Sequence, residues 1–259
     1  MITSRLLIPV IACMLLAWTL SSFGAEPSGP PLSGSQPLTW TDDIASRLVD
    51  GADRFLLRFE TSDPELYRRI HPPLPGTTSD RVAQLLRMRA LGYEIGTGVM
   101  VGIPGQTWDI LARDIGLFRD LDIDMIGIGP FLPSPRTPLG GDAAERLRAA
   151  EDEQVPNDEL TTLKVVALTR LVCPEANLPS TTALSTLDPA TGRELGLLRG
   201  ANIVMPNVTP PAYRVLYEIY PGKASFHETA QVSIEQRIRA IGRHVGEGPG
   251  GRRRVRIQN

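Results

Sequence analysis

Two short apolar runs that end in glycine and proline constrain the fold of this chain more than any other feature. They are GVMVGIPG at residues 98–105 and DMIGIGPFLP at residues 124–133. Each is rich in Val, Ile and Met and is followed by polar residues that begin helices, which is typical of a buried parallel strand entering a βα loop. Repetition of this unit predicts an α/β fold with successive right-handed crossovers.

Further strands of this kind are expected along the chain, with helical patterns between them. The expected strands begin near Arg54, Glu94, Asp124, Leu178 and Asn202. The chain has 259 residues, of which 42% are hydrophobic and 22% charged, and its net charge is −2, as in one ordinary globular domain. This charge gives no indication of a nucleic-acid partner.

The N-terminal residues do not share the α/β pattern. Within residues 1–25, Arg5 precedes an apolar run and then small residues, with Ser22 and Gly24 spaced like the recognition positions of a signal peptidase. The run is shorter than the roughly 20 residues that a membrane-spanning helix needs, so the segment is interpreted as signal-peptide-like. A misassigned start, or a fragment joined to an unrelated domain, is the alternative that stays open.

The rest of the chain divides by composition. Residues 26–40 are rich in Pro, Gly and Ser and are predicted to form a linker. The folded domain is expected at residues 41–245, followed by a basic tail at residues 246–259. Residues 140–158 are mostly charged residues and alanine, and this composition predicts a solvated excursion over one end of the domain.

The first predicted strand has an apolar face and a charged face. The charged face carries Arg54, Leu56, Arg58 and Glu60. Such a face does not point into a dry core unless its charges pair or meet a ligand. Two interpretations stay open: a buried ion pair between Arg58 and Glu60, or a polar binding cavity. The cavity is favoured because later strands show the same trend.

A helix is predicted from the cap Ser79 to the terminating Gly92. Arg81 lies in its first turn, where the helix dipole does not support a cation, so it either reaches toward an anion or is a solvated surface residue. The strand that follows places three glycines and one methionine on one face, at Gly96, Gly98, Met100 and Gly102. Removal of side chains from one face of a strand opens space in which a ligand can approach the backbone.

Metal-binding motifs are missing from this sequence. Its two cysteines, Cys13 and Cys173, are too few for a disulfide framework or a cysteine-held metal cluster, and its three histidines lack ligand spacing. Cys173 is interpreted as a small, packed hydrophobic residue. The residues by themselves therefore predict a parallel α/β domain with a charged, glycine-lined cavity, and they do not name a reaction.

From about Thr41 to Arg254 the sequence resembles the C-terminal part of the FeFe-hydrogenase maturation radical S-adenosylmethionine enzymes, a biotin synthase-like family. The resemblance rests on strings that occur in the family's order: GADRFLLRFETSDPELYRRIHP, GYEIGTGVMVGIPGQT, DMIGIGPFLPSPRTP, TLKVVALTRL, LPSTTALSTL, GANIVMPNVTP and LYEIYPGK. It implies a partial (β/α)8 TIM-type barrel of about five C-terminal βα units, with about three of the first strands missing.

In that family a Cx3Cx2C loop binds a 4Fe-4S cluster, and S-adenosylmethionine is cleaved reductively to a 5′-deoxyadenosyl radical. The resemblance implies that Glu60 and Arg81 bind S-adenosylmethionine, with support from Arg58. Met125 would pack on its adenosyl group, and the GVMVGIPG strand matches the family's adenine-side motif. The small-molecule substrate, which bears a carboxylate, sulfur or iron, would contact Arg54, Thr181, Thr182, Met205, Tyr217 and Tyr220.

The chain departs from the family pattern because it has no Cx3Cx2C loop. Cys173 alone cannot ligate a cluster, so no catalytic residue is assigned and the chain is expected to be inactive by itself. One alternative is an exported, non-catalytic module that binds a small carboxylate through Arg54, Arg58 and Arg81. Another is a partner chain that supplies the missing strands and cysteines. The signal-like segment favours export, whereas a cluster enzyme belongs in the reducing cytoplasm.

Overall fold

The computed structural model describes residues 52–71, 80–206, 210, 213 and 233–252. The signal-like segment, the linker and the expected domain start at Thr41 lie outside these ranges. So do Tyr217, Tyr220 and the last part of the basic tail. Within the described ranges, no helix combines the length and the apolar character that crossing a membrane requires.

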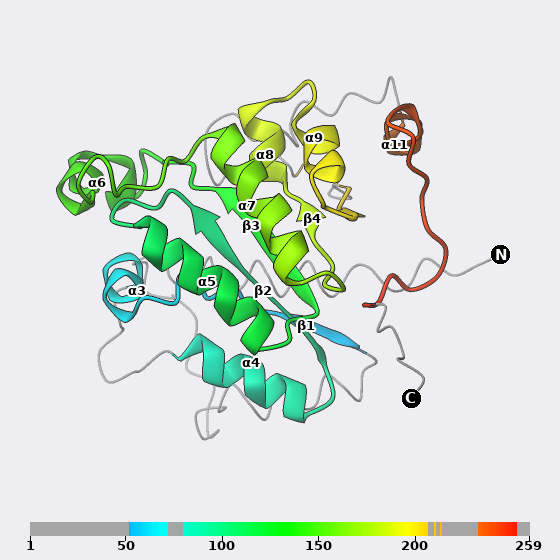
Figure 1. Ribbon diagram of the computed structural model, residues 1–259, viewed down its shortest axis with the longest axis horizontal. Coiled ribbons are helices and arrows are strands. Elements are labelled where there is room, and N and C mark those ends of the chain that lie inside the picture. The colour runs from blue at the N-terminus through cyan, green and yellow to red at the C-terminus, as the bar shows by residue number, and fades with distance from the viewer. Residues whose placement is uncertain (1–51, 72–79, 207–209, 211–212, 214–232, 253–259) are drawn as a thin grey trace. The chain divides into compact units, whose positions relative to one another are not determined.

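Five parallel strands follow one another in chain order within one sheet, β1-β2-β3-β4-β5. Their bounds are β1 (Arg54–Leu56), β2 (Glu94–Val101), β3 (Met125–Pro130), β4 (Pro179–Ser180) and β5 (Ile203–Val204). Each begins at, or next to, the residue that the sequence pattern predicts. Strands β1, β2, β3 and β4 are labelled in Figure 1. The α/β class and the topology of consecutive βα units of a (β/α)8 barrel are therefore confirmed.

The chain separates into two compact units. One comprises the residues up to Leu57 together with Asp80–Gly96, and the other comprises Arg58–Ser79 and the residues from Thr97 onward. Strand β2 runs through both units, because its first residues belong to the former and its last residues to the latter.

In the first unit, helix α4 (Arg81–Ala90) packs on β1. The N-cap of α4 is Asp80, whose carboxylate accepts a hydrogen bond from the Ala83 amide at 2.9 Å, and not the predicted Ser79. Gly92 follows the helix with a φ of 97°, which confirms its predicted role in ending the helix.

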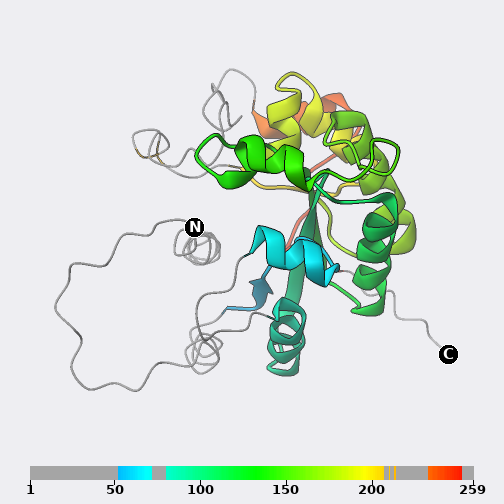
Figure 2. The same ribbon diagram turned by 90° about the vertical axis from the view of Figure 1, so that its left-hand side faces the viewer.

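The second unit contains the other helices of the described residues. They are α3 (Pro64–Ile70), α5 (Trp108–Asp120), the 3-10 turn η1 (Pro138–Gly140), α6 (Asp142–Leu147), α7 (Glu159–Val172), α8 (Thr182–Leu187), α9 (Gly192–Leu198) and α11 (Ile234–Ala240). Side-chain oxygens of Thr107, Asp158 and Thr181 cap α5, α7 and α8. Figure 2 shows α5 and α7 on the same side of β3, and the two helices contact each other.

The core of the second unit includes a cluster at the C-terminal ends of β2 and β3. Leu66, Ile103, Ile110 and Phe131 are buried there against one another. They come from α3, the loop after β2, α5 and the residue that follows β3. Their packing fixes the βα loops at the edge of the sheet where (β/α)8 barrels place their functional sites.

Candidate functional site

The charged residues that follow β1 form an ion pair. Arg58 Nε donates a hydrogen bond to Glu60 Oε1 at 2.9 Å, and Arg58 Nη2 donates to the Val99 carbonyl oxygen at 2.6 Å. The second carboxylate oxygen, Glu60 Oε2, is buried and has no hydrogen-bond partner among the described residues. An unsatisfied buried acceptor costs free energy that a ligand with a donor group can recover. The predicted ion pair between Arg58 and Glu60 is therefore present, and within the described part of the chain one of its carboxylate oxygens is left without a donor.

The backbone at Glu60 is strained. Its φ is 65°, and the Thr61 amide donates to the Phe59 carbonyl oxygen at 2.9 Å, so the three residues form a γ-turn of the rare positive-φ form. The Glu60 amide also donates to the Gly98 carbonyl oxygen at 3.0 Å. A strained polar residue a few positions after a barrel strand is a candidate for a functional position.

The glycines of β2 serve a different role from the predicted one. A Cβ atom on Gly96 would lie 2.9 Å from the Leu56 side chain, and one on Gly98 would lie 2.1 Å from the Gly127 carbonyl oxygen. A Cβ atom on Gly102 would lie 2.5 Å from Asn157. These positions allow neighbouring protein atoms to approach closely, so the expectation of open space along this face is wrong.

Gly127 lies beside the ion pair. A Cβ atom at this position would lie 3.5 Å from Arg58 Nη1, in ordinary van der Waals contact with the guanidinium group. Gly127 was not selected from the sequence, although it lies in the second of the apolar runs that predicted the fold.

Thr181 and Thr182 lie at the C-terminal end of β4. The Thr181 hydroxyl donates to the Ile128 carbonyl oxygen at 3.1 Å and accepts a hydrogen bond from the Leu184 amide at 3.4 Å. The hydroxyl of Thr181 is thus already used to join β3 to the start of α8. Thr182 is the first residue of α8 and is half-buried.

The other predicted site residues lie at different places in the fold. Arg54 begins β1 and pairs with Glu94 at 2.7 Å. Met125 begins β3, and Met205 follows β5 with 44% of its surface exposed. Arg81 begins α4 in the first unit. Of the predicted residues, the structure joins Arg58 to Glu60 by a direct contact.

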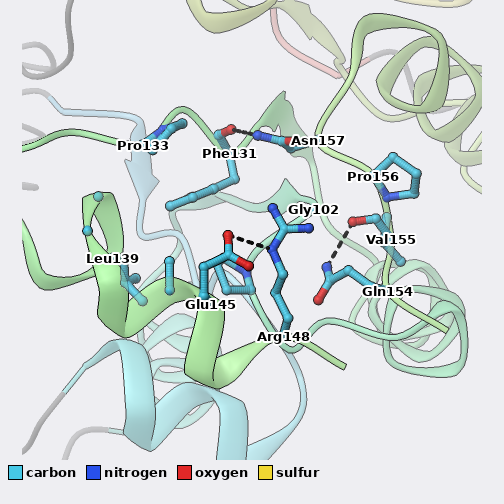
Figure 3. Close-up of a pocket in the computed structure, with 14 residues that line it drawn as sticks. Gly102, Phe131, Pro133, Leu139, Glu145, Arg148, Gln154, Val155, Pro156 and Asn157 are labelled. Carbon is cyan, nitrogen blue, oxygen red and sulfur yellow. Dashed lines mark hydrogen bonds and ion pairs between the residues drawn. The ribbon is translucent and has the colours of Figure 1, made fainter. Parts of the chain in front are cut away.

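A cavity of about 240 Å³ lies in the second unit beside the end of β2. Figure 3 shows Phe131 and Leu139 on one side of it and Gln154 and Val155 on the other. Gln154 accepts a hydrogen bond from the Gly105 amide at 2.8 Å and donates to the Ile103 carbonyl oxygen at 3.1 Å. It is 9% exposed, so the prediction of a solvated excursion is wrong at this residue.

Two buried polar residues that were not selected from the sequence support the loops around Glu60. Asp114 on α5 accepts a hydrogen bond from the Ser62 amide at 2.5 Å, and Gln106 accepts one from the Gly102 amide at 2.7 Å. Burial raises the pKa of Asp114 to about 6. The sequence carries a signal for Asp114, because it recurs at helical spacing with the apolar residues Ile110 and Phe118.

The described residues do not fit an iron–sulfur cluster. Cys173 is buried at the end of α7, and burial raises the pKa of its thiol, which disfavours the thiolate form that binds metals. Within the part of the chain that the structure describes, no group of three or more His, Cys, Asp or Glu side chains is arranged to hold a metal ion.

No family model matches this chain. Over 208 residues, the chain is 45% identical to the FeFe hydrogenase maturase subunit HydE of Thermotoga maritima, a match that covers 79% of this chain and 56% of that protein. This chain is HydE-like. It spans about half the length of the curated relatives that it matches.

The chain is also similar, in sequence and in fold, to methylornithine synthases. The HydE-like chain is 30% identical over 154 residues to 3-methylornithine synthase of Methanosarcina acetivorans, covering 60% of this chain and 39% of that protein. Its fold matches the crystal structure of methylornithine synthase (PylB) with a TM-score of 0.58 at 23% identity, over 80% of this chain and 56% of the other. The structural likeness supports the barrel topology alone.

Proposed function

We propose that this HydE-like chain is the cofactor- and substrate-binding C-terminal part of a hydrogenase-cofactor maturase, which binds S-adenosylmethionine but does not cleave it by itself. The observation that supports this most directly is Glu60 Oε2, which is buried and has no hydrogen-bond partner in the part of the chain that the structure describes, while Oε1 of the same carboxylate bonds Arg58. S-adenosylmethionine carries an ammonium group and ribose hydroxyls, each of which can donate the missing hydrogen bond. The 45% identity to HydE supports the choice of this ligand over other donors.

Four side chains have assigned roles in this proposal. Glu60 accepts a hydrogen bond from the cofactor, and Arg58 orients Glu60 through its contact at 2.9 Å. Arg81 binds the cofactor carboxylate through a charge-assisted contact, and Met125 packs on the adenosyl group. In the family, S-adenosylmethionine supplies a 5′-deoxyadenosyl radical after reductive cleavage. The substrate is proposed to be a small molecule that contacts residues at the ends of β4 and β5.

The cluster that drives this cleavage does not fit the residues of this chain. A cluster of this kind requires three thiolates at one iron–sulfur site, whereas the chain has two cysteines, Cys13 and Cys173. No step through a cluster is therefore assigned to these residues. The residues assigned above would act in catalysis only together with a partner polypeptide that supplies the Cx3Cx2C loop.

The contacts do not favour an exported carboxylate-binding module. Arg54 is paired with Glu94, and Arg58 with Glu60, so these two cations already have carboxylate partners. Binding of a carboxylate by Arg81 is the one role that this alternative shares with the cofactor proposal.

Two measurements on the purified full chain test the proposal. Equilibrium dialysis with radiolabelled S-adenosylmethionine is expected to show binding. Anaerobic reconstitution with iron and sulfide is expected to give neither a 4Fe-4S spectrum nor 5′-deoxyadenosine. Failure to bind the cofactor contradicts the binding role, and reductive cleavage by the reconstituted chain contradicts the claim of inactivity.

A further inference from the structure

The turn that carries Glu60 and the loop that follows β2 contact one buried carboxylate. The Ser62 amide donates to Asp114 Oδ1 at 2.5 Å, and Gln106 Nε2 lies 3.4 Å from Asp114 Oδ2 as a second donor. Asp114 has no exposed surface and lies in the middle of α5. One side chain thus bridges two βα loops that are far apart in sequence.

Gln106 is the contact on the side of the β2 loop. Its Oε1 accepts a hydrogen bond from the Gly102 amide at 2.7 Å, and its Nε2 donates to the Met100 carbonyl oxygen at 3.1 Å. Because both ends of the side-chain amide are engaged, exchange of its oxygen and nitrogen would break two hydrogen bonds. Gln106 therefore presents a donor, not an acceptor, to Asp114.

Ser62 is the contact on the side of the Glu60 turn. It follows the strained γ-turn and precedes Asp63, whose carboxylate caps α3 through the Leu66 amide at 2.8 Å. The bond from the Ser62 amide to Asp114 attaches this segment to a helix elsewhere in the sequence. A hydrogen bond to a buried carboxylate is stronger than one between neutral groups, so it can hold a turn whose backbone is strained.

We infer that Asp114 is a positioning residue that connects the Glu60 turn to the loop after β2. It thereby fixes the direction of Glu60 Oε2, the oxygen that has no partner among the described residues. The connection between the two loops follows from the contacts alone. Its consequence for the cofactor rests on the proposed function. Asp114 itself is assigned no contact with the cofactor or the substrate.

Two substitutions separate the two contacts of Asp114. Asp114→Ala removes both acceptors. Asp114→Asn retains an acceptor for the Ser62 amide but places an amide nitrogen opposite Gln106 Nε2, so that two donors face each other. Asp114→Ala is therefore expected to loosen both loops, whereas Asp114→Asn loosens the Gln106 side more than the Ser62 side.

Two controls separate positioning from general loss of stability. Asp120→Asn changes an exposed carboxylate on the same helix, where Asp120 pairs with Arg119. Arg252→Gln removes the ion pairs of Arg252 with Asp122 and Asp124, which lie where β3 begins and away from the Glu60 turn. It is expected to destabilise the same unit without changing the two loops.

Hydrogen exchange measured by mass spectrometry on the full chain reports directly how firmly the two loops are held. In Asp114→Ala, the amides of residues 61–63 and those of residues 102–106 other than Pro104 are expected to exchange at least about tenfold faster, with no such change in either control. The dissociation constant for S-adenosylmethionine is expected to rise at least about tenfold in the same variant. If Asp114→Ala does not fold, the exchange rates of residues 102–106 in Asp114→Asn test the inference instead.

Unchanged exchange at these residues overturns the inference. So does faster exchange with a dissociation constant that stays within about twofold of the wild type. A wild-type chain that does not bind S-adenosylmethionine contradicts the proposed function instead, and the exchange data then decide the connection between the two loops by themselves.

Discussion

Arg58 bonds one carboxylate oxygen of Glu60 at 2.9 Å, and the other oxygen is buried without a partner among the described residues. Arg58 is itself held by the Val99 carbonyl oxygen and lies next to Gly127. The orientation of Glu60 is therefore set by protein contacts before any ligand arrives. A carboxylate that is fixed in this way, with one acceptor left open, is prepared to receive a donor.

The coupling between Arg58 and Glu60 can be measured by a double-mutant cycle. Arg58→Ala leaves Glu60 buried and unpaired, so it is expected to lower the free energy of unfolding by about 1–3 kcal/mol, a range reduced from that of fully buried pairs because Arg58 is partly exposed. In a Glu60→Gln background the same change is expected to cost about 1 kcal/mol less. Urea unfolding measures both values. Arg68→Ala, at an exposed position on α3, is the control, and additive effects of the two changes would contradict the coupling.

Gly98→Ala is expected to destabilise the chain, because the new Cβ atom would lie 2.1 Å from the Gly127 carbonyl oxygen. Neighbouring strand backbones must move to relieve this contact, at a cost of about 1–3 kcal/mol or more. Gly116→Ala is the matched control, since Gly116 lies within α5 and a methyl group there would meet no atom within 4 Å beyond the backbone of its own helix. It is expected to stabilise the chain by about 0.5–1 kcal/mol. Equal thermal midpoints for the two variants would contradict the packing.

The raised pKa of Asp114 predicts a pH dependence of stability. Its pKa is about 6 in the folded chain against a usual value of 3.8, so folding disfavours ionisation. The stability that protonated Asp114 contributes is full below about pH 4 and is lost as the pH rises through about 6, with a total change of about 3 kcal/mol. The difference in unfolding free energy between wild type and Asp114→Asn should therefore shift by this amount in urea titrations at several pH values. A difference that does not vary with pH would contradict the assignment.

Arg81→Ala is expected to weaken binding of S-adenosylmethionine by about tenfold or more, because a charge-assisted contact to the cofactor carboxylate is lost. Arg87→Ala is the control, since Arg87 is exposed in the last turn of the same helix. Equilibrium dialysis of both variants measures the effect. Equal dissociation constants for wild type and Arg81→Ala would show that the role assigned to Arg81 is wrong.

The order and the starts of the strands were predictable from the sequence, because buried parallel strands leave continuous apolar runs that end in glycine. The γ-turn at Glu60 was not predictable. No residue type in ETSD demands a positive φ, and the conformation depends on contacts that Gly98 and Asp114 make from other elements. Tertiary contacts of this kind leave no periodic pattern in the chain.

The candidate site was predictable in part. The alternating charges identified Arg58 and Glu60, but the pattern did not decide between an ion pair and a cavity. The structure shows an ion pair in which one carboxylate oxygen has no partner within the described ranges. The glycine stripe was misinterpreted because a missing side chain makes room equally for a ligand and for a neighbouring strand. Asp114 was overlooked although a carboxylate on the apolar face of a helix is itself a signal of a buried hydrogen-bond network.

Calorimetric titration of S-adenosylmethionine into the full chain, in wild type and in Glu60→Gln, tests the central claim most directly. The control is Glu65→Gln, which alters an exposed carboxylate that pairs with Arg69 on α3. We predict binding by wild type and by Glu65→Gln, and a dissociation constant at least about tenfold higher for Glu60→Gln. Equal affinity of all three proteins would contradict the role of Glu60 as the acceptor for the cofactor.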